Sequence, residues 1–377
     1  MMLPIALRML WHKPTRAVFT VLGLGALFFL SAAQIGLLVG WCTTCSAIIR
    51  HADVDLWIMA EQTPAFDYGT AIPRQRLYEV RSVPGVAWAE GMFMAWNIWQ
   101  RPDGRRVNIE LIGLDSSCVG GPWVMEAGTV EVVHRPDGVI IDELFLSELG
   151  VTGIGGEAEL IGRRARVRGV SGGVRTFTAS PFVFTSINNA IRYDRRYRDD
   201  EITYVLARCR PDTVPDEVAE EIRQRTDHVE VLTSDQFVQR SVTYWMLGTG
   251  IGITVVLTAI LGFLVSAVVI SQTLFGLTTD YLVNYTTLLA LGFSRTKLLL
   301  TIVYQSLVLG GAGIVLGGMA FLTAMRVSAR TMIPLETTSE VSVGLVACAL
   351  VCSVVGAGLS VKSVWRIDPA QVLRGGG

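Results

Sequence analysis

Few residues of this chain could do chemistry, and the most closely spaced of them are the two cysteines of Cys42-Thr-Thr-Cys45. Thiols at this spacing form redox centres in a strand-then-helix context, whereas these two follow a long apolar run. With His51 nearby they could also hold a metal, but structural zinc sites use four ligands and no fourth is evident. We therefore expect a local disulfide or two free thiols here, and no metal site.

Motifs for nucleotide binding and hydrolysis are absent from the sequence. It contains no G-x-x-x-x-G-K-[ST] phosphate loop, no H-E-x-x-H zinc motif and no G-x-S-x-G nucleophile motif. His51, His134 and His228 stand apart from one another in the chain. We predict no catalytic residue and no cofactor here, so the chain is not expected to be an enzyme by itself.

Four apolar segments, at residues 17–41, 246–271, 298–325 and 341–361, are the longest elements that the sequence predicts. Because a helix rises about 1.5 Å per residue, about 20 apolar residues cross the hydrocarbon core of a bilayer. None of the four contains Asp, Glu, Lys, Arg or His, which argues against an ion or proton pathway through them. We predict a membrane protein with an α-helical, four-span transmembrane domain and a large domain, residues 42–245, between the first two spans.

Basic residues predict which side of the membrane each connection faces. Most Lys and Arg outside residues 42–245 lie in segments 1–16, 272–297 and 362–377, and only Arg326 and Arg330 lie between spans three and four. By the positive-inside rule, segment 1–16, segment 272–297 and the 362–377 tail are cytoplasmic. The 42–245 domain and the short 326–340 loop then face outward.

Pairs of glycines at G-x-x-x-G spacing occur in or beside three of the spans: Gly36 and Gly40, Gly248 and Gly252, and Gly313 and Gly317. Such pairs let two helices approach closely. The contact could join two copies of the chain or two helices of one copy, and the sequence leaves both open.

Within the 42–245 domain, hydrophobic patterns predict alternating strands and helices. Period-two alternation predicts a strand in 53–60, Pro73 opens a helix that closes at Pro84-Gly85, and strands follow at 92–100 and 107–114. A similar unit returns as strand 202–208, helix 215–225 and strand 229–232. Between them we expect a mostly β subdomain, with a strand at 139–141, a helix from Asp142 to Leu149 that is stopped by Gly150, and a hairpin of 157–161 with 165–170. Ser234 is expected to cap a helix that continues into the second span.

Charge further limits the partners of this domain. Residues 42–245 hold 22 basic and 29 acidic residues, and every basic one is Arg. An acidic domain does not favour binding to nucleic acid or to anionic lipid headgroups.

Three stretches carry a family resemblance: Ala6-Leu-Arg-Met-Leu-Trp-His-Lys13, Asn284-Tyr-Thr-Thr-Leu-Leu-Ala-Leu-Gly-Phe-Ser294 and Ile367-Asp-Pro-Ala-Gln-Val-Leu-Arg374. They resemble the amphipathic start, the "E-x-x-x-L-(K/R)-A-(L/M)-G" segment after span two and the "D-P-(A/V)-E-A-L-R" ending of MacB/FtsX-type ABC transporter permeases. The arrangement of one span, a large domain and three spans is similar too. Region 243–294 looks closest to the DevC-type branch.

This resemblance implies a fold and a location. The 42–245 domain would be an extracytoplasmic α+β domain, a MacB-like periplasmic core with an α/β porter-like part and an inserted, mostly β subdomain. The protein would be a multi-pass protein of the bacterial inner (cytoplasmic) membrane with both termini cytoplasmic.

The resemblance also implies an ATPase-coupling site in segment 272–297, made by Leu282, Asn284, Tyr285, Leu288, Leu291, Gly292 and Arg295. The family's C-terminal motif falls on Asp368, Pro369, Leu373 and Arg374. Three departures weaken a charge-based contact: Asn284 replaces the usual Glu, Leu289 replaces the usual basic residue, and Gln371 stands where Glu is common. Docking through the apolar face of Leu282, Tyr285 and Leu288 remains open.

As function, the resemblance implies a permease subunit that couples ATP hydrolysis by a separate cytoplasmic ABC ATPase to movement of its extracytoplasmic domain. ATP and Mg are expected in that ATPase. Export by a homodimer, with a periplasmic membrane-fusion protein and an outer-membrane channel, is the leading hypothesis. The alternative is a regulatory permease that moves no solute and controls an extracytoplasmic enzyme. The sequence does not indicate a substrate.

Overall fold

The computed structural model describes residues 8, 10, 14–178, 180–281, 287, 292–329, 331 and 334–365. The chain forms two compact units. One consists of Met1–Gly40, Thr254–Ala329 and Pro334–Gly377, and the other of Trp41–Ile253 and Arg330–Ile333. We call them the helical unit and the sheet unit.

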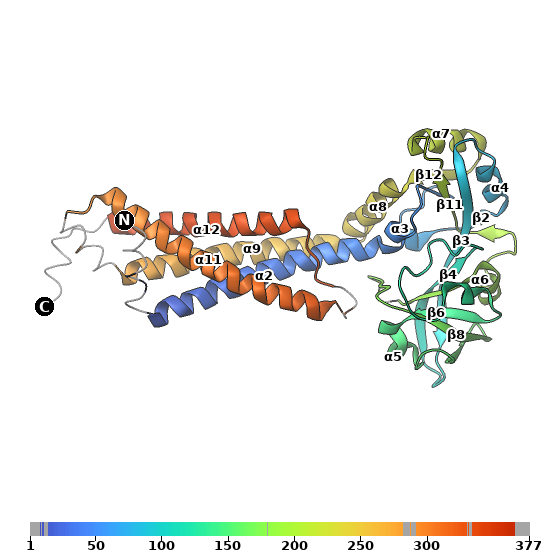
Figure 1. Ribbon diagram of the computed structural model, residues 1–377, viewed down its shortest axis with the longest axis horizontal. Helices are drawn as coiled ribbons and strands as arrows, with labels where there is room; N and C mark the ends of the chain where they lie inside the picture. Colours follow the sequence, from blue (N-terminus) through green and yellow to red (C-terminus); the bar gives the residue numbers. More distant parts are fainter. Residues whose placement is uncertain are drawn as a thin grey trace. The chain divides into compact units, whose positions relative to one another are not determined.

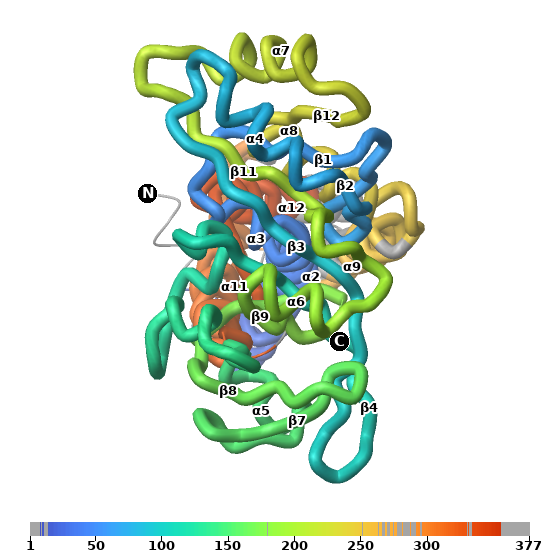
Figure 2. The backbone as a smooth tube through the Cα atoms, turned by 90° about the vertical axis from the view of Figure 1, so that its right-hand side faces the viewer, coloured from blue at the N-terminus to red at the C-terminus, as the bar shows by residue number. Residues whose placement is uncertain are grey.

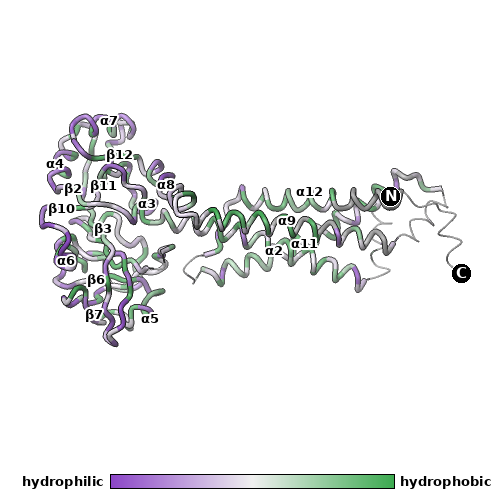
Figure 3. Tube along the Cα trace, turned by 180° about the vertical axis from the view of Figure 1, so that it is seen from behind, coloured by the Kyte–Doolittle hydropathy of each residue, from purple (hydrophilic) through white to green (hydrophobic). Residues whose placement is uncertain are grey.

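Long apolar helices supply the helical unit: α2 (Pro14–Cys45), α9 (Ile251–Asp280), α11 (Arg295–Ser328) and α12 (Ser339–Trp365). Figure 3 shows that hydrophobic residues predominate along them. Among the described residues, Pro14–Cys45 and Thr296–Ser328 are long and apolar enough to cross a membrane. A third candidate arises if the bent pair Ser234–Gly248 and Gly252–Gly262 forms one span, and Ser339–Val355 is a shorter apolar helix. The helices indicate an integral membrane protein, and the count of four spans stays a prediction.

The helical unit has a small core of its own. Leu24 from α2 is buried with Leu298, Ile302 and Leu309 from α11, and with Tyr281, which follows α9. Helices far apart in the sequence therefore pack together in this unit.

The sheet unit begins with the last residues of α2, from Trp41, followed by helix α3 (Ala47–His51), and it contains twelve strands among the described residues. These are β1 (Leu56–Ala60), β2 (Ile72–Pro73), β3 (Val86–Gln100), β4 (Arg106–Leu114), β5 (Met125–Ala127), β6 (Gly138–Asp142), β7 (Glu157–Leu160), β8 (Arg163–Ser171), β9 (Phe182–Ser186), β10 (Glu201–Ile202), β11 (Tyr204–Cys209) and β12 (Val229–Thr233). The α-helices between and after them are α4 (Gln75–Arg81), α5 (Leu146–Leu149), α6 (Ile187–Tyr193), α7 (Pro215–Arg225) and α8 (Ser234–Thr243). Shorter turns of helix are η1 (Phe66–Tyr68), η2 (Val130–His134), η3 (Glu143–Phe145) and the π-helical η4 (Tyr244–Gly248).

Strand β3 connects two parts of the main sheet. The strand order is β12-β1-β11-β3-β4-β9-β6-β8-β5, and β7 pairs with both β3 and β8. Starting from β3, the pairings through β4, β9, β6, β8 and β7 return to β3, where Trp99 pairs with Leu160. These strands close a ring, which is joined to the open sheet β12-β1-β11 by the first half of β3. Figure 2 shows β7 and β8 at one end of the unit and α7 with β12 at the other.

Both faces of the sheet are covered, because alternate residues of each strand point to opposite sides. One core contains Leu56 and Ile58 of β1 with residues of α4, α6 and α7. The other contains Trp57 and Met59 of the same strand with residues of α3, η1 and α8. Helix α7 and strand β12 lie side by side at one end of the unit (Figure 1).

Most predicted elements of this unit are confirmed. Helix α7 has the predicted bounds, and β7 and β8 form the predicted hairpin. The mostly β subdomain is present, but it shares β3 and β4 with the α/β part. The predicted start of α4 was wrong: Pro73 lies in β2, paired with Glu201, and the helix begins at Gln75. Strand β9 and helix α6 were not predicted.

The predicted end of the sheet unit needs two corrections. The cap of α8 is Thr233, not Ser234, because its hydroxyl accepts a hydrogen bond from the Gln236 backbone N–H while the Gln236 side chain accepts one from the Thr233 N–H. The helix also does not run unbroken into the second span. After α8 the chain makes the π-helical turn η4, and Gly250, at φ 75°, separates it from α9.

Candidate functional site

The predicted ATPase-coupling residues lie mostly outside the described residues; these are Leu282, Asn284, Tyr285, Leu288 and Leu291. Gly292 is described and has a φ of 88°, the left-handed conformation that suits a glycine after a helix. Arg295 is the first residue of α11, whose N-cap Ser294 accepts a hydrogen bond from the backbone N–H of Lys297. The C-terminal motif, Asp368, Pro369, Leu373 and Arg374, also lies outside the described residues.

Two of the predicted packing glycines lie where α11 contacts α2. A Cβ on Gly313 would come within 2.8 Å of the Leu24 Cβ and 3.2 Å of the Gly25 nitrogen. A Cβ on Gly317 would collide with the carbonyl oxygen of Gly25. Since no side chain fits between the backbones, these glycines allow two helices of the same chain to approach closely.

Gly36 and Gly40 on α2 are also enclosed by their own chain. A Cβ on Gly36 would lie 2.9 Å from the ring of Phe321 in α11, and one on Gly40 would collide with the carbonyl oxygen of Pro334. The Gly36 carbonyl accepts a hydrogen bond from the Glu336 N–H at 3.0 Å. These contacts fix the segment before α12 against α2.

Gly248 and Gly252 face their own segment instead of another helix. A Cβ on Gly248 would lie 3.1 Å from the Tyr244 ring, and one on Gly252 would collide with the Met246 backbone. Both glycines therefore serve the turn between α8 and α9, and dimerisation through the glycine pairs stays a prediction.

The structure does not bring the Cys42–Cys45 pair and His51 together as a metal site. Cys45 is buried, Cys42 is half-buried, and both are free thiols. The His51 ring instead stacks on Trp123, with ring centroids 4.0 Å apart. The described residues contain no group of three or more His, Cys, Asp or Glu arranged to hold a metal ion.

An aromatic cluster lies at the end of the sheet unit where α2 enters it and η4 leaves it. We call it the junction cluster; its members are Trp41, Cys42, Cys45, Ala65, Phe177, Tyr244, Trp245 and Met246. The Phe177 ring meets both Trp41 and Trp245 edge-on, with centroids 5.8 Å and 4.5 Å apart. Phe177 thus connects the end of α2 to η4.

Next to the junction cluster, two acidic side chains are buried in contact. Asp67, in η1, is 2% exposed, and Glu110, in β4, is 0% exposed. The two carboxyl groups act on each other electrostatically, since the negative charge of Asp67 raises the pKa of Glu110. Trp245 donates its Nε1–H to Asp67 Oδ2 at 2.9 Å, and Thr178 donates its hydroxyl to Glu110 Oε1 at 2.6 Å. We call Asp67 and Glu110 the acid pair.

Electrostatics indicate that the acid pair holds a proton. Burial raises the pKa of Asp67, because water no longer stabilises its charge. Burial and the negative charge of Asp67 raise the pKa of Glu110 well above its usual range, while the hydroxyl of Thr178 partly offsets that shift. Two buried carboxylates in contact cannot both ionise without a large electrostatic cost. One proton therefore stays on the pair.

Sequence reasoning missed Asp67, Glu110 and Trp245. One signal was available: Glu110 shares a strand face with Ile112 and Leu114, which the alternation places in a core. A carboxyl group on a buried, otherwise apolar face requires a partner. That partner is distant in the sequence, so the pattern alone could not name it.

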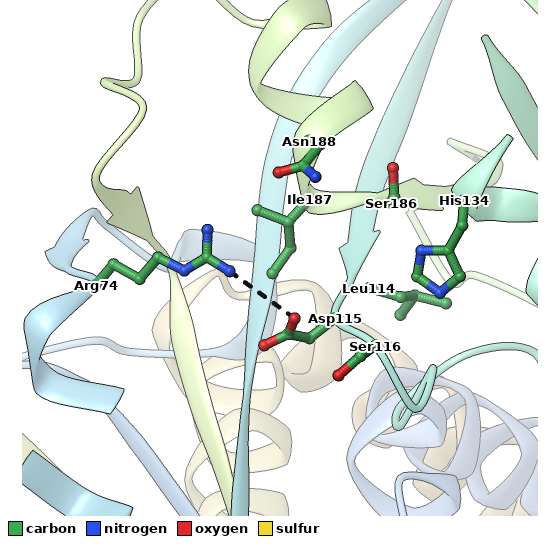
Figure 4. Close-up of a pocket in the computed structure, with 8 residues that line it drawn as sticks. All are labelled: Arg74, Leu114, Asp115, Ser116, His134, Ser186, Ile187 and Asn188. Atoms are coloured by element: carbon green, nitrogen blue, oxygen red, sulfur yellow. Dashed lines mark ion pairs between the residues drawn. The ribbon is translucent and has the colours of Figure 1, made fainter. Parts of the chain in front are cut away.

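A polar cavity of about 260 Å³ is a second candidate site in this unit (Figure 4). Its lining residues are Arg74, Leu114, Asp115, Ser116, His134, Ser186, Ile187 and Asn188. Arg74 reaches toward Asp115, with 3.9 Å between Nη2 and Oδ1, and Asp115 also accepts the Gly91 N–H at 3.2 Å. Because the charges of Arg74 and Asp115 neutralise each other, the cavity would bind a ligand through hydrogen bonds and not through an unpaired charge.

The thiol beside this cavity is not activated for nucleophilic attack. His134 Nε2 lies 3.3 Å from Cys118 Sγ. Burial, helped by the negative charges of Glu131, Glu90 and Asp115, raises the pKa of Cys118 to about 11. Because the thiolate is the reactive form, a raised pKa leaves this cysteine inert at neutral pH.

Comparison with protein families gives one match that covers much of the chain. The family model of the MacB-like periplasmic core domain matches residues 18–225, which is more than half of the chain. The match starts within α2 and ends with α7, so it includes most of the sheet unit.

Solved structures give weaker similarity. The periplasmic region of MacB from Actinobacillus actinomycetemcomitans is 13% identical, with a TM-score of 0.38, covering 51% of this chain and 94% of that one. The extracellular domain of the noncanonic ABC-type transporter YknZ from Gram-positive bacteria is 11% identical, with a TM-score of 0.36, covering 48% and 98%. No curated protein matches the chain.

Proposed function

This chain belongs to the MacB/FtsX-type ABC transporter permeases, and from that premise we propose that it is the membrane subunit of a transporter whose ATPase is a separate cytoplasmic protein. Its sequence has no phosphate loop, so ATP and Mg would be bound by the ATPase. The chain itself is a non-catalytic subunit that passes on mechanical work.

The observation that carries this proposal is the junction cluster. Apart from the short segment Arg330–Ile333, which is also assigned to the sheet unit, the chain passes between the units at Gly40–Trp41 and at Ile253–Thr254. Trp41 and Trp245, which lie near these two crossings, both contact Phe177. Closely packed side chains transmit displacement instead of absorbing it. A shift of either helix would therefore reach one place in the sheet unit, beside η1 and β4.

For orientation and partners, we propose that the sheet unit faces the periplasm of a bacterium and that both termini are cytoplasmic. The distribution of Lys and Arg along the chain supports this orientation. The apolar spans support work on a substrate outside the membrane, because they offer no charged pathway through it. We propose that a homodimer of this subunit drives export with a membrane-fusion protein and an outer-membrane channel.

The deciding experiment is recovery of the partner ATPase with the tagged chain. Leu288 lies on the apolar face predicted for segment 272–297. Replacing it by Asp would put an unpaired carboxylate into the docking groove, at a cost of a few kcal/mol, or about a hundredfold in affinity. Thr287→Asp is the matched control, because Thr287 is helical, exposed and off that face.

At equal membrane levels, wild type and Thr287→Asp should recover the ATPase and Leu288→Asp should lose it. Equal recovery with both variants would refute docking through this segment. The regulatory function would be favoured over export by a different result. The ATPase would then bind and be stimulated, an extracytoplasmic enzyme would be activated, and no solute would be exported.

A further inference from the structure

The acid pair connects several elements that lie beside the junction cluster. Asp67 belongs to η1, Glu110 to the centre of β4, and Trp245 to the first turn of η4. Thr176 and Thr178, whose hydroxyls lie 3.4 Å and 2.6 Å from Glu110 Oε1, belong to the loop before β9. The hydrogen bonds of two carboxyl groups therefore involve two helical turns, one loop and one strand.

One atom of the acid pair marks where its proton lies. The Oε1 atom of Glu110 accepts the threonine hydroxyls, whereas Oε2 is buried and has no N–H or hydroxyl partner among the described residues. A buried oxygen without a donor is costly unless it carries a proton of its own. A hydroxyl at Oε2, donating to Asp67, satisfies both groups.

Few charged groups lie near the acid pair that could stabilise two ionised carboxylates in place of that proton. The titratable groups that its charge affects are Tyr68 from η1, Tyr204 from β11 and Cys45 from the end of α2, and all are neutral when protonated. Arg175, the neighbour of Thr176 in the loop, is not among the groups that shift the pKa of Asp67 or Glu110. Without its proton, the pair would be two carboxylates facing each other in a buried site.

Removal of the proton should act on Trp245 and on the loop. Repulsion between the carboxylates would favour separation of η1 from β4, with water entering to solvate the charges. Separation breaks the Asp67–Trp245 bond and frees Thr178, and with it the Phe177 ring between Trp41 and Trp245. The packing that links both helix ends is then lost.

We propose that Asp67 and Glu110 form a proton-operated latch: one shared proton keeps η4 and the 172–178 segment fixed to the sheet, and its loss releases them. The closed latch would transmit movement of the helices to the sheet unit, and the open latch would not. This regulatory consequence rests on the proposed function, whereas the latch is a property of the chain alone.

The test is amide hydrogen exchange of the purified full chain in detergent micelles, between about pH 5 and pH 8, corrected for the intrinsic pH dependence of exchange. Peptides covering 172–181 and 241–250 report on the latch. If opening releases one proton, their corrected opening constant should rise up to about tenfold per pH unit in wild type. The measurement needs no ATPase, so it is independent of the docking experiment.

Three variants make the test specific. In Glu110→Gln, the side-chain amide can donate to Asp67 at any pH, so both peptides should lose their pH dependence. Asp67→Asn should do the same, because its carbonyl can still accept from Trp245 while its amide donates to Glu110. Glu90→Gln is the matched control: Glu90 is also buried but is held by Ser117 and not by a second carboxyl group. It should behave as wild type.

Flat opening constants in folded wild-type protein would overturn the latch, whatever the variants do. A Glu110→Gln variant with the wild-type pH dependence would overturn it too, because the proton would then act elsewhere. If Glu110→Gln does not fold, Asp67→Asn and the wild-type profile decide the question in the same way.

Discussion

Trp245 donates its indole N–H to the carboxylate of Asp67 across 2.9 Å, and both side chains are buried. The bond joins the first turn of η4 to the helical turn η1. Helix α9 follows η4 in the chain. Hydrogen bonds to a charged group contribute about 1.5–3 kcal/mol, more than bonds between neutral groups. The connection to α9 is therefore held by a directional contact as well as by ring packing.

Removing this donor should destabilise the sheet unit. We expect Trp245→Phe to lower its stability by about 1–3 kcal/mol, because Asp67 Oδ2 loses its donor and stays buried. The smaller ring keeps part of the contact with Phe177. The loss is measured by thermal unfolding of the purified full chain in micelles, with limited proteolysis of the sheet unit as the readout.

Trp88→Phe is the control for that substitution. Trp88 lies in β3 and is 38% exposed, so the same replacement there should change stability by about 0.5 kcal/mol or less. A Trp245→Phe protein as stable as the Trp88→Phe protein would show that the hydrogen bond contributes nothing.

Local patterns predicted most strands and helices because each carries its signal within a few residues. Alternation identified β1, and Pro215 marked the first turn of α7. Strand β9 escaped because all five of its residues are buried, so it shows no alternation. Its neighbours β4 and β6 cover it on both sides, and those pairings join distant parts of the chain.

The break before α9 and the acid pair escaped for a related reason. The run from Ser241 to Thr279 contains no charge, so composition predicts one continuous helix. The interruption depends on the backbone of Gly250, which adopts a positive φ. The acid pair depends on contacts between η1, β4 and η4, and a single sequence gives no direct measure of such contacts.

Close packing of α2 and α11 predicts a steric effect in the helical unit. A Cβ at Gly317 would collide with the Gly25 carbonyl oxygen, which is backbone and cannot move aside alone. We expect Gly317→Ala to cost about 1–3 kcal/mol, the usual range for overpacking. The measurement is thermal unfolding of the full chain in micelles.

Gly311 provides the matched control on the same helix. A Cβ there would meet no atom within 4 Å, so Gly311→Ala should be neutral or stabilise α11 by up to about 1 kcal/mol through helix propensity. Equal melting temperatures for the two variants would mean that α2 and α11 do not pack at Gly317 in the protein.

Thiol reactivity provides a pH-dependent prediction. Burial raises the pKa of Cys118 and of Cys209 to about 11, and the charge of Asp55 adds to the shift at Cys209. A raised pKa lowers the thiolate fraction at every pH below it. In the folded protein, alkylation of both should rise about tenfold per pH unit from pH 7 to pH 10 without a plateau.

Unfolded protein is the reference for this measurement. In denaturant both thiols should approach a plateau near pH 9, because ordinary cysteine has a pKa of about 8.5. Mass spectrometry of peptides after timed alkylation follows each cysteine separately. A plateau below pH 9 in the folded protein would show a more exposed or more activated thiol than the structure has.

The orientation of the chain can be tested with two single cysteines on a cysteine-free background. Thr152 is exposed in the sheet unit, and Ser294 is exposed at the start of α11. Because Lys and Arg gather in segments 1–16, 272–297 and 362–377, we expect Thr152 outside and Ser294 in the cytoplasm. A membrane-impermeant maleimide should therefore label Thr152→Cys in intact cells, and Ser294→Cys only after permeabilisation. Loss of the Ser294 cap costs about 1 kcal/mol, which is too little to reverse insertion. Labelling of Ser294→Cys in intact cells, with Thr152→Cys protected, would show the opposite orientation, with the sheet unit in the cytoplasm.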